Sequence, residues 1–185
     1  MNELSGGFTD AAIESAIAFR AILKVTARPG RVERLSSHHG SAPISNAAAA
    51  VLLVLADRTT PLYLAGDHDN PALRQWIAFY SGAPIVPAES ATFALGSWSA
   101  LMPLDRFAIG TPEYPDRSAM LIVDRHNFDA PPVELRGPGI KGRAMLALPE
   151  REAFMANHAR FPLGWDAIFC GENQLAALPR STEVR

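Results

Sequence analysis

Cysteine and lysine are scarce in this sequence. Its 185 residues include one cysteine, Cys170, and two lysines, Lys24 and Lys141. A single cysteine excludes an internal disulfide framework and a cysteine-rich metal site. Because Cys170 lies in an apolar run, we expect its thiol to be protonated and unreactive. The other 15 of the 17 basic residues are arginines, whose planar guanidinium groups suit carboxylate or phosphate recognition.

A dense basic block and a long apolar run are both missing. The formal net charge is -2, and a nucleic-acid footprint usually needs a basic face, so we expect no nucleic-acid partner. No apolar run reaches the roughly 18 residues of a membrane span, and the N-terminus lacks a basic-then-apolar signal pattern. We therefore expect no membrane association and a cytoplasmic location.

Three common catalytic motifs are also absent. The sequence has no Gly-x-Ser-x-Gly elbow, Walker A loop or His-Glu-x-x-His pair. It therefore assigns no catalytic residue. The two histidine-containing clusters, residues 38–39 and residues 67–69, are interpreted as a solvated loop pair and as turn or helix capping. We expect no metal site.

Length and composition indicate one domain, residues 1–185. The chain is 48% hydrophobic, and a chain of this size buries roughly 70% of its unfolded surface. Apolar periodicity, caps and turn residues predict helices at residues 10–27, 46–56, 71–81 and 150–160, and strands at residues 31–35, 61–66, 92–95, 118–124, 133–135, 144–148, 167–170 and 174–178.

Three details of these elements can be tested directly. The first helix is expected to bury the stripe Ala12, Ala16, Phe19 and Leu23. A short helix near Ala100 is expected within an exposed connection at residues 96–117. The last two strands are expected to pair through the turn at residues 171–173 and to lie centrally. The whole predicts a three-layer α/β domain around a mixed sheet.

A cationic turn joins the predicted strands at residues 133–135 and 144–148. Glycines in it let backbone N–H groups approach a ligand, and three cations flank them, so an anion could bind there. The alternative is a plain hairpin turn whose glycines adopt positive φ. The residues in question are Arg136, Gly137, Gly139, Lys141 and Arg143.

Asp166 is a second candidate. It opens the strand at residues 167–170, next to Trp165. A carboxylate at a strand end suits a ligand site in an α/β fold, but capping of the local backbone explains it equally well.

Several short segments, taken together, resemble the H-subunit family of the bacterial carbon–phosphorus lyase system, PhnH. They match in order and spacing: Phe-Arg at 19–20 with Arg-Pro-Gly at 28–30, Leu-Ala-Asp-Arg-Thr-Thr-Pro at 55–61, Ala-Thr-Phe-Ala at 91–94, Leu-Arg-Gly-Pro-Gly-Ile at 135–140, Phe-Pro-Leu-Gly-Trp-Asp at 161–166, and Ala-Leu-Pro-Arg-Ser-Thr at 177–182. The family usually has Thr where this chain has Ser181. Arg28 and Arg180 lie in these segments and join the ligand or interface candidates.

The resemblance implies a role in phosphonate use. Together with the G, I and L subunits, the H subunit supports transfer of a phosphonate such as methylphosphonate to C1 of the ribose of ATP, with release of adenine. The G, H, I and J subunits form a core complex. The resemblance also implies a homodimer with a shortened pyridoxal-phosphate-dependent transferase fold but no cofactor. The sequence is consistent with that absence, because a Schiff base needs a well-placed lysine and neither lysine is well placed.

Two classes of function stay open. One is an obligate complex subunit that is not catalytic alone. The other is a free-standing enzyme or binding protein for a small phosphorylated metabolite. The connection at residues 96–117 favours the first, because aromatic and methionine residues are enriched in interfaces. Those residues are Trp98, Leu101, Met102 and Phe107.

Overall fold

The structure is a computed structural model that describes residues 6–35 and 43–185. The predicted loop at residues 36–41, with His38 and His39, lies outside the described residues. The elements follow one another in this order: α1 Ala11–Ala27, β1 Glu33–Arg34, α2 Asn46–Leu55, β2 Leu62–Leu64, η1 Gly66–His68, α3 Pro71–Tyr80, η2 Ala88–Ser90, β3 Phe93–Gly96, α4 Trp98–Leu101, η3 Leu104–Arg106, β4 Met120–Asp124, β5 Pro132–Arg136, β6 Ala144–Ala147, α5 Arg151–His158, β7 Asp166–Cys170, β8 Gln174–Leu178 and β9 Glu183–Val184.

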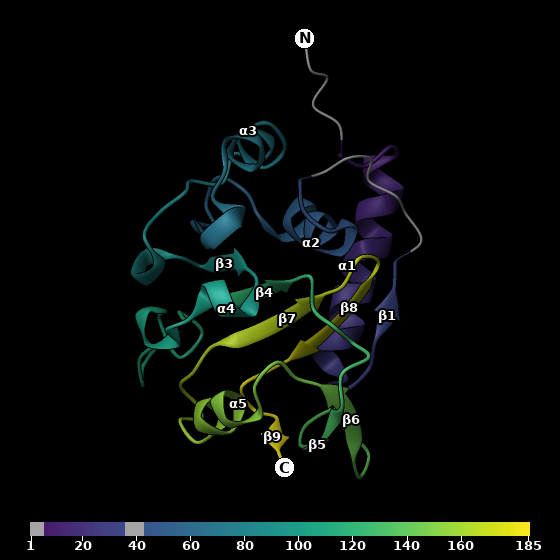
Figure 1. The fold of residues 1–185 in the computed structure, drawn as a ribbon, viewed down its shortest axis with the longest axis vertical. Helices are drawn as coiled ribbons and strands as arrows, with labels where there is room; N and C mark the ends of the chain where they lie inside the picture. The colour runs from purple at the N-terminus through teal and green to yellow at the C-terminus, as the bar shows by residue number, and fades with distance from the viewer. Residues whose placement is uncertain (1–5, 36–42) are drawn as a thin grey trace.

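A mixed six-stranded sheet forms the centre of the fold, with strand order β1-β8-β7-β4-β3-β2. Strands β2, β3, β4 and β7 run parallel, whereas β8 and β1 are antiparallel to their neighbours. Helices precede or follow most of the parallel strands (Figure 1). The α/β class and the mixed sheet are therefore as predicted.

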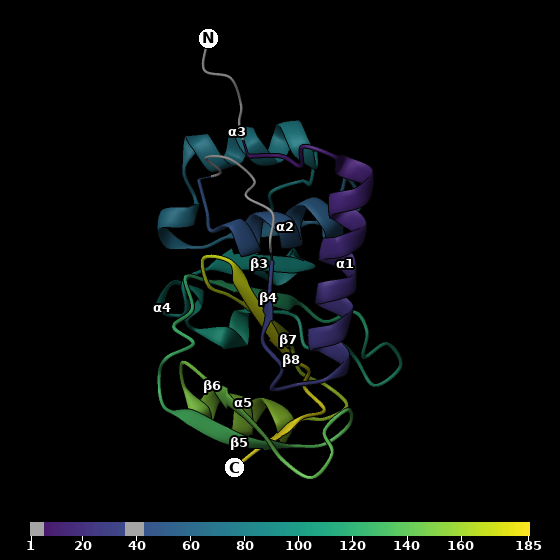
Figure 2. The ribbon, with the colours of Figure 1, turned by 90° about the vertical axis from the view of Figure 1, so that its right-hand side faces the viewer.

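Apolar side chains cover both faces of this sheet. Alternation along β4 shows the division, because Ile122 belongs to the core under α1, α2 and α3, whereas Leu121 and Val123 belong to the core on the opposite face. Figure 2 shows α2 and α3 on one side of the sheet and α5 with β5 and β6 on the other. Such alternation is what a strand buried on both faces requires.

The C-terminal hairpin confirms its prediction. Strands β7 and β8 pair antiparallel, and both lie inside the sheet. The backbone N–H of Gly171 donates to the carbonyl of Gln174 at 2.9 Å and closes the turn. The predicted helix caps are also present in α2 and α3: Ser45 accepts from the backbone N–H of Ala48, and Asn70 accepts from that of Leu73.

A second, smaller sheet was not predicted. Strands β5 and β6 form the expected hairpin, but they pair with β9 rather than with the main sheet, in the order β6-β5-β9. The backbone N–H of Arg185 donates to the carbonyl of Glu134 at 2.9 Å. A two-residue strand such as β9 has no periodicity of its own, which explains why the pattern missed it.

The predicted buried stripe of α1 was wrong. Phe19 and Leu23 are 44% and 51% exposed, and the buried residues are instead Ala18, Ala21, Ile22 and Val25. Both sides of this helix carry apolar residues, so periodicity alone could not say which side packs on the sheet. Four large apolar side chains of α1 are therefore exposed, with Phe19 and Leu23 along one edge of its outward side and Ile13 and Ile17 along the other.

The connection at residues 96–117 contains the predicted short helix, α4. It is less exposed than expected, because Leu101 and Phe107 are buried in the core on the α5 side of the sheet. Of the four residues singled out as interface candidates, Met102 is 40% exposed. No helix within the described ranges is long and apolar enough to cross a membrane.

Candidate functional site

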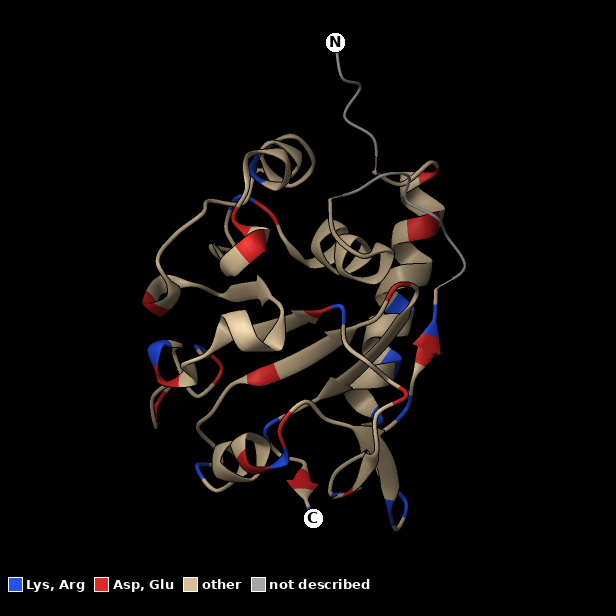
Figure 3. Cartoon of the chain, viewed as in Figure 1, with Lys and Arg blue, Asp and Glu red and all other residues tan. Residues whose placement is uncertain are grey.

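The cationic turn lies between β5 and β6, and its charges are partly neutralised. Arg136 Nε is 2.8 Å from Glu134 Oε1, and Arg143 Nη1 is 3.8 Å from Glu134 Oε2. The Arg143 side chain is 74% exposed. Basic residues elsewhere are spread over several elements and mixed with acidic ones (Figure 3). One carboxylate thus already faces two of the three cations that were expected to bind an anion.

Two glycines of this turn have packing and conformational roles. Gly137 and Gly139 have φ of +132° and +79°, as the hairpin interpretation requires. A Cβ added to Gly139 would lie 2.0 Å from the carbonyl oxygen of Ala27. The turn therefore packs against the C-terminal end of α1, next to Arg28, which is the exposed C-cap residue of that helix.

Substituting Gly139 with alanine should lower the free energy of unfolding by about 2–4 kcal/mol, because the new methyl group collides with backbone and adopts a strained φ. Gly142→Ala is the matched control, because Gly142 has φ of +81° but no atom within 4 Å of an added Cβ. We expect about 1 kcal/mol there. Urea unfolding of both variants measures the difference, and equal losses would show that the contact with Ala27 has no effect.

Asp166 and Arg180 form a half-buried ion pair. Arg180 Nη2 is 2.7 Å from Asp166 Oδ2, and Arg180 Nε is 3.1 Å from Asp166 Oδ1. The remaining nitrogen, Nη1, donates to the carbonyl of Pro115 at 2.8 Å, and Nη2 also donates to Ser118 Oγ at 2.5 Å. Asp166 also accepts from the backbone N–H of Arg180. The pair ties three segments together, with its donors occupied by protein atoms.

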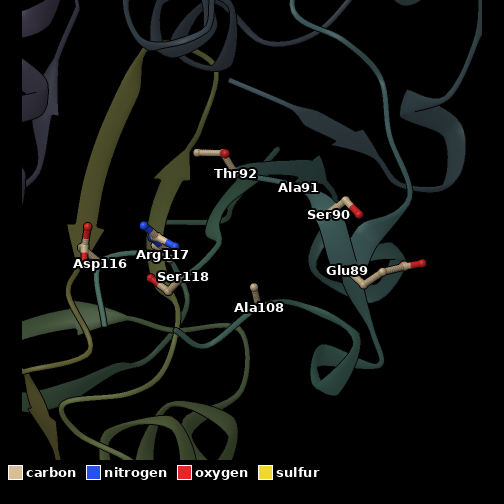
Figure 4. A pocket seen from close by; sticks show the side chains of 8 residues that line it. All are labelled: Glu89, Ser90, Ala91, Thr92, Ala108, Asp116, Arg117 and Ser118. Atoms are coloured by element: carbon tan, nitrogen blue, oxygen red, sulfur yellow. The ribbon is translucent and has the colours of Figure 1, made fainter. Parts of the chain in front are cut away.

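This pair lies at the amino end of β7, which is the edge opposite to the usual ligand edge of a parallel sheet. A cavity of about 360 Å³ lies at the same edge, before β3 and β4 (Figure 4). It mixes the carboxylates of Glu89 and Asp116 with Arg117, whose guanidinium stacks 4.0 Å over the ring of Tyr114. Neither the Asp166–Arg180 pair nor this cavity brings together unpaired charges of the same sign.

The carboxyl ends of the parallel strands carry a buried polar cluster that the sequence interpretation missed. Asp124, the last residue of β4, is 1% exposed. His68 Nε2 lies 2.9 Å from Asp124 Oδ2, and the Ser45 hydroxyl donates a short hydrogen bond to Asp124 Oδ1. The cluster thus joins the N-cap of α2, the 3₁₀ turn after β2 and the end of β4.

The cluster differs from a serine hydrolase triad. In such a triad the histidine lies between the serine and the carboxylate, where it can remove the serine proton. Here the carboxylate of Asp124 lies between Ser45 and His68. Ser45 Oγ also accepts from the backbone N–H of Ala48 at 3.1 Å, as a helix cap. The arrangement gives Ser45 no general base and serves to hold the three segments together.

Electrostatics of this edge follow from burial. Burial of Asp124 raises its pKa, but hydrogen bonds from His68 and Ser45 outweigh that effect, so the pKa is lowered overall. Burial, together with the charge of Asp124, raises the pKa of the Cys170 thiol well above its ordinary value. The thiol is therefore protonated near neutral pH, as the sequence predicted.

Arg125 follows Asp124 in an unusual backbone conformation. Its φ is +58°, and it is the one non-glycine residue with positive φ in the described ranges. Arg125 is a lining residue of two cavities near this strand end. Because left-handed backbone is uncommon for residues with a side chain, such an outlier points to a constraint at this position.

The residues near His68 confirm the capping interpretation only in part. Asp69 pairs with Arg74 and Asn70 caps α3, but His68 is buried and binds Asp124. Within the described ranges, no three His, Cys, Asp or Glu side chains gather closely enough to hold a metal ion. A detectable signal was present in the sequence, since Asp124 ends a continuous apolar strand and a carboxylate there must find a partner.

Comparison with known proteins identifies a family that matches most of the chain. Residues 6–185 match the model of a family described as bacterial phosphonate metabolism protein (PhnH). The chain is 36% identical, over 97% of its length and 94% of the relative's, to the alpha-D-ribose 1-methylphosphonate 5-triphosphate synthase subunit PhnH of Rhizobium meliloti (strain 1021). It is 27% identical, over 90% and 84% of the two chains, to HtxG of Stutzerimonas stutzeri, provisionally described as a C-P lyase subunit. The chain therefore belongs to the PhnH family of bacterial phosphonate metabolism proteins.

Proposed function

We propose that this chain is a subunit of the enzyme complex that makes alpha-D-ribose 1-methylphosphonate 5-triphosphate from ATP and methylphosphonate, with release of adenine. The observation that carries the proposal is similarity over 97% of the chain to a subunit bearing that name. Its partners are the G, I and J subunits of the core complex, with the L subunit acting in the same reaction. Its place of action is the cytoplasm, and residues 1–185 act as one domain.

Growth on methylphosphonate tests this proposal. A bacterium that lacks its own H subunit should not use methylphosphonate as sole phosphorus source, and a plasmid carrying this chain should restore growth. The same plasmid with Asp124→Ala, which removes the centre of the buried cluster, is the matched control. If a tagged copy of the chain restores nothing and recovers no partner subunit from phosphate-starved cells, the proposal is wrong and a free-standing protein becomes the better interpretation.

The uncovered face of α1 supports a homodimer. Ile13 is 60% exposed and Ile17 is 45% exposed along one edge of the outward side of α1, and Phe19 and Leu23 are exposed along its other edge. Large apolar side chains grouped on one helix are typical of an interface, because exposure of such a group to water costs free energy. We propose that this face packs against a second copy of the chain in the isolated protein.

We expect Ile17→Glu with Leu23→Glu to convert the dimer to a monomer in sedimentation velocity at tens of micromolar, with little change in melting temperature. Met155→Glu is the control, because Met155 is 41% exposed but lies on α5. A wild-type chain that sediments as a monomer would contradict the homodimer. A dimer that persists in the double variant would place its interface elsewhere.

The cations of the β5–β6 turn are proposed to contact a partner subunit or a phosphorylated ligand, together with Arg28. If the turn is structural only, Arg136→Ala with Arg143→Ala should change stability by less than about 1 kcal/mol and leave growth on methylphosphonate intact. If it is a contact surface, each lost contact should weaken binding by about 1.5–3 kcal/mol, with normal melting. Growth, complex recovery and melting temperature of the double variant separate these outcomes.

The proposed likeness to pyridoxal-phosphate-dependent transferases extends to fold only. A Schiff base needs a lysine at the ligand site, but Lys24 lies on α1 and is 3.9 Å from Glu33, and Lys141 lies in the β5–β6 turn. The residues present do not fit this cofactor, and a borohydride-reduced adduct on either lysine would overturn that conclusion.

A further inference from the structure

A cavity of about 240 Å³ lies at the carboxyl ends of β3 and β4. We call it the carboxyl-edge cavity and define it by Ser97, Trp98, Arg125, Asn127, Leu148 and Pro149, which are among its lining residues. Ligands of open α/β sheets bind outside the carboxyl ends of the strands, because loops there converge around exposed backbone groups. The cavity therefore lies where such a fold places a ligand site.

The buried cluster fixes Arg125 at the rim of this cavity. The backbone N–H of Arg125 donates to the carboxylate of Asp124, which His68 and Ser45 hold from the other side. The backbone N–H of the next residue, His126, donates to the carbonyl of Cys170 at 2.8 Å. These bonds hold Arg125 at φ +58°, so its direction of departure from the sheet is set by the fold.

The guanidinium of Arg125 is available to a ligand. Arg125 is exposed, and none of the residues in ranges 6–35 and 43–185 hydrogen-bonds to its side chain or forms an ion pair with it. Two neighbours add donors. Asn127 uses Oδ1 to accept from the backbone N–H of Asp129 at 3.0 Å, which leaves its amide N–H groups. Ser97 contributes a hydroxyl whose oxygen lies 3.3 Å from the Ser99 hydroxyl and can accept from it.

The opposite wall is apolar and rigid. The indole of Trp98 stacks on Phe154 with ring centroids 5.2 Å apart, and Trp98 Nε1 donates to Glu150 Oε2 at 3.2 Å. That bond uses one oxygen of the Glu150 carboxylate. Asp124 also lines the cavity, but its carboxylate already accepts from His68, Ser45 and the backbone N–H of Arg125. Glu172 lies with Ser45 in another cavity that Arg125 also lines. The carboxyl-edge cavity thus combines a fork-shaped cation, two neutral donors and an aromatic wall with one carboxylate that is already hydrogen-bonded.

We propose that the carboxyl-edge cavity binds the phosphonyl or phosphoryl group of a small molecule. Arg125 would hold two of its oxygens, Ser97 and Asn127 would donate to the group, and Trp98 and Leu148 would contact its organic substituent. The volume is below the roughly 300–1,000 Å³ of pockets that enclose drug-sized ligands, so the ligand is small. The choice of phosphorus oxyanion over carboxylate rests on the proposed function.

Fluorescence titration of the purified chain tests the proposal, because Trp98 lines the cavity. The probes are methylphosphonate, inorganic phosphate and acetate. Methylphosphonate or phosphate should give a saturable change at millimolar concentration, and acetate should bind more weakly. Arg125→Asn should weaken binding about tenfold or more, because a charge-assisted contact is lost while asparagine still tolerates positive φ. Arg125→Lys, which keeps the charge but not the fork, should fall between the two.

Arg160→Asn is the matched control, since Arg160 is exposed, follows the end of α5 and is not among the residues that line the cavity. It should bind like the wild type. Absence of saturable binding, unchanged affinity in Arg125→Asn, equal affinity for acetate, or a loss that follows Arg143→Asn instead would each overturn the proposal. Recovery of the complex with partner subunits is measured separately for the wild type and Arg125→Asn. If the wild type assembles normally but binds no ligand, the ligand proposal fails and the subunit role stands.

Discussion

Asp124→Ala is expected to lower the free energy of unfolding by about 3–5 kcal/mol. The substitution removes a carboxylate that is 1% exposed and leaves His68, 5% exposed, and the Ser45 hydroxyl without their partner. An unpaired polar group costs far more when buried than in water. Asp116→Ala is the control, because Asp116 is exposed shortly before the same strand, and it should change stability by less than about 0.5 kcal/mol.

The stability that the Asp124 carboxylate contributes should depend on pH. The folded state lowers the pKa of Asp124, so the carboxylate contributes stability that is fully present above its ordinary value of about 3.9 and is lost as pH falls through the lower folded value. The advantage of the wild type over Asp124→Asn should thus be constant between about pH 5 and 8 and shrink below about pH 4. A difference that grew on acidification would contradict this assignment.

Arg180→Ala should lower the free energy of unfolding by about 2–4 kcal/mol, because it breaks a half-buried ion pair and frees the carbonyl of Pro115 and the hydroxyl of Ser118. Arg185→Ala is the matched control. Arg185 Nε is 2.9 Å from Glu183 Oε1, but both side chains are more than 40% exposed, so the loss should stay below about 1 kcal/mol.

Thermal or urea unfolding measures both arginine variants. The sequence predicts Arg180 as a ligand or interface contact, and in the structure its guanidinium binds Asp166, Pro115 and Ser118. A variant that melts like the wild type but no longer joins partner subunits would support the predicted contact role.

Helices with strong end signals could be predicted from the sequence alone. Asn70 and Pro71 marked the start of α3, and Ser45 marked that of α2, because a cap is a local interaction. The β7–β8 hairpin could be predicted because its signal is equally local. The face on which α1 packs could not be predicted, because Ala18, Ile22 and Val25 on one side are matched by the apolar residues Ile17, Phe19 and Leu23 elsewhere on the helix.

The candidate site was harder to predict because it is assembled from distant segments. Ser45, His68 and Asp124 are separated by more than 20 residues from one another, and only the order of the parallel strands brings them together. The carboxylate chosen from the sequence, Asp166, also ends a strand, but it is the amino end of β7. Strand direction relative to the sheet, which single-sequence patterns do not give, places Asp124 and Asp166 at opposite edges.

Adenine release measured with defined subunits tests the subunit role most directly. Methylphosphonate and ATP are mixed with the G, I and L subunits, with or without this chain, and free adenine is quantified by chromatography. The proposed function predicts that adenine and the ribose 1-methylphosphonate 5-triphosphate appear only when the chain is added. Full turnover without the chain, or turnover by the chain alone, would contradict it.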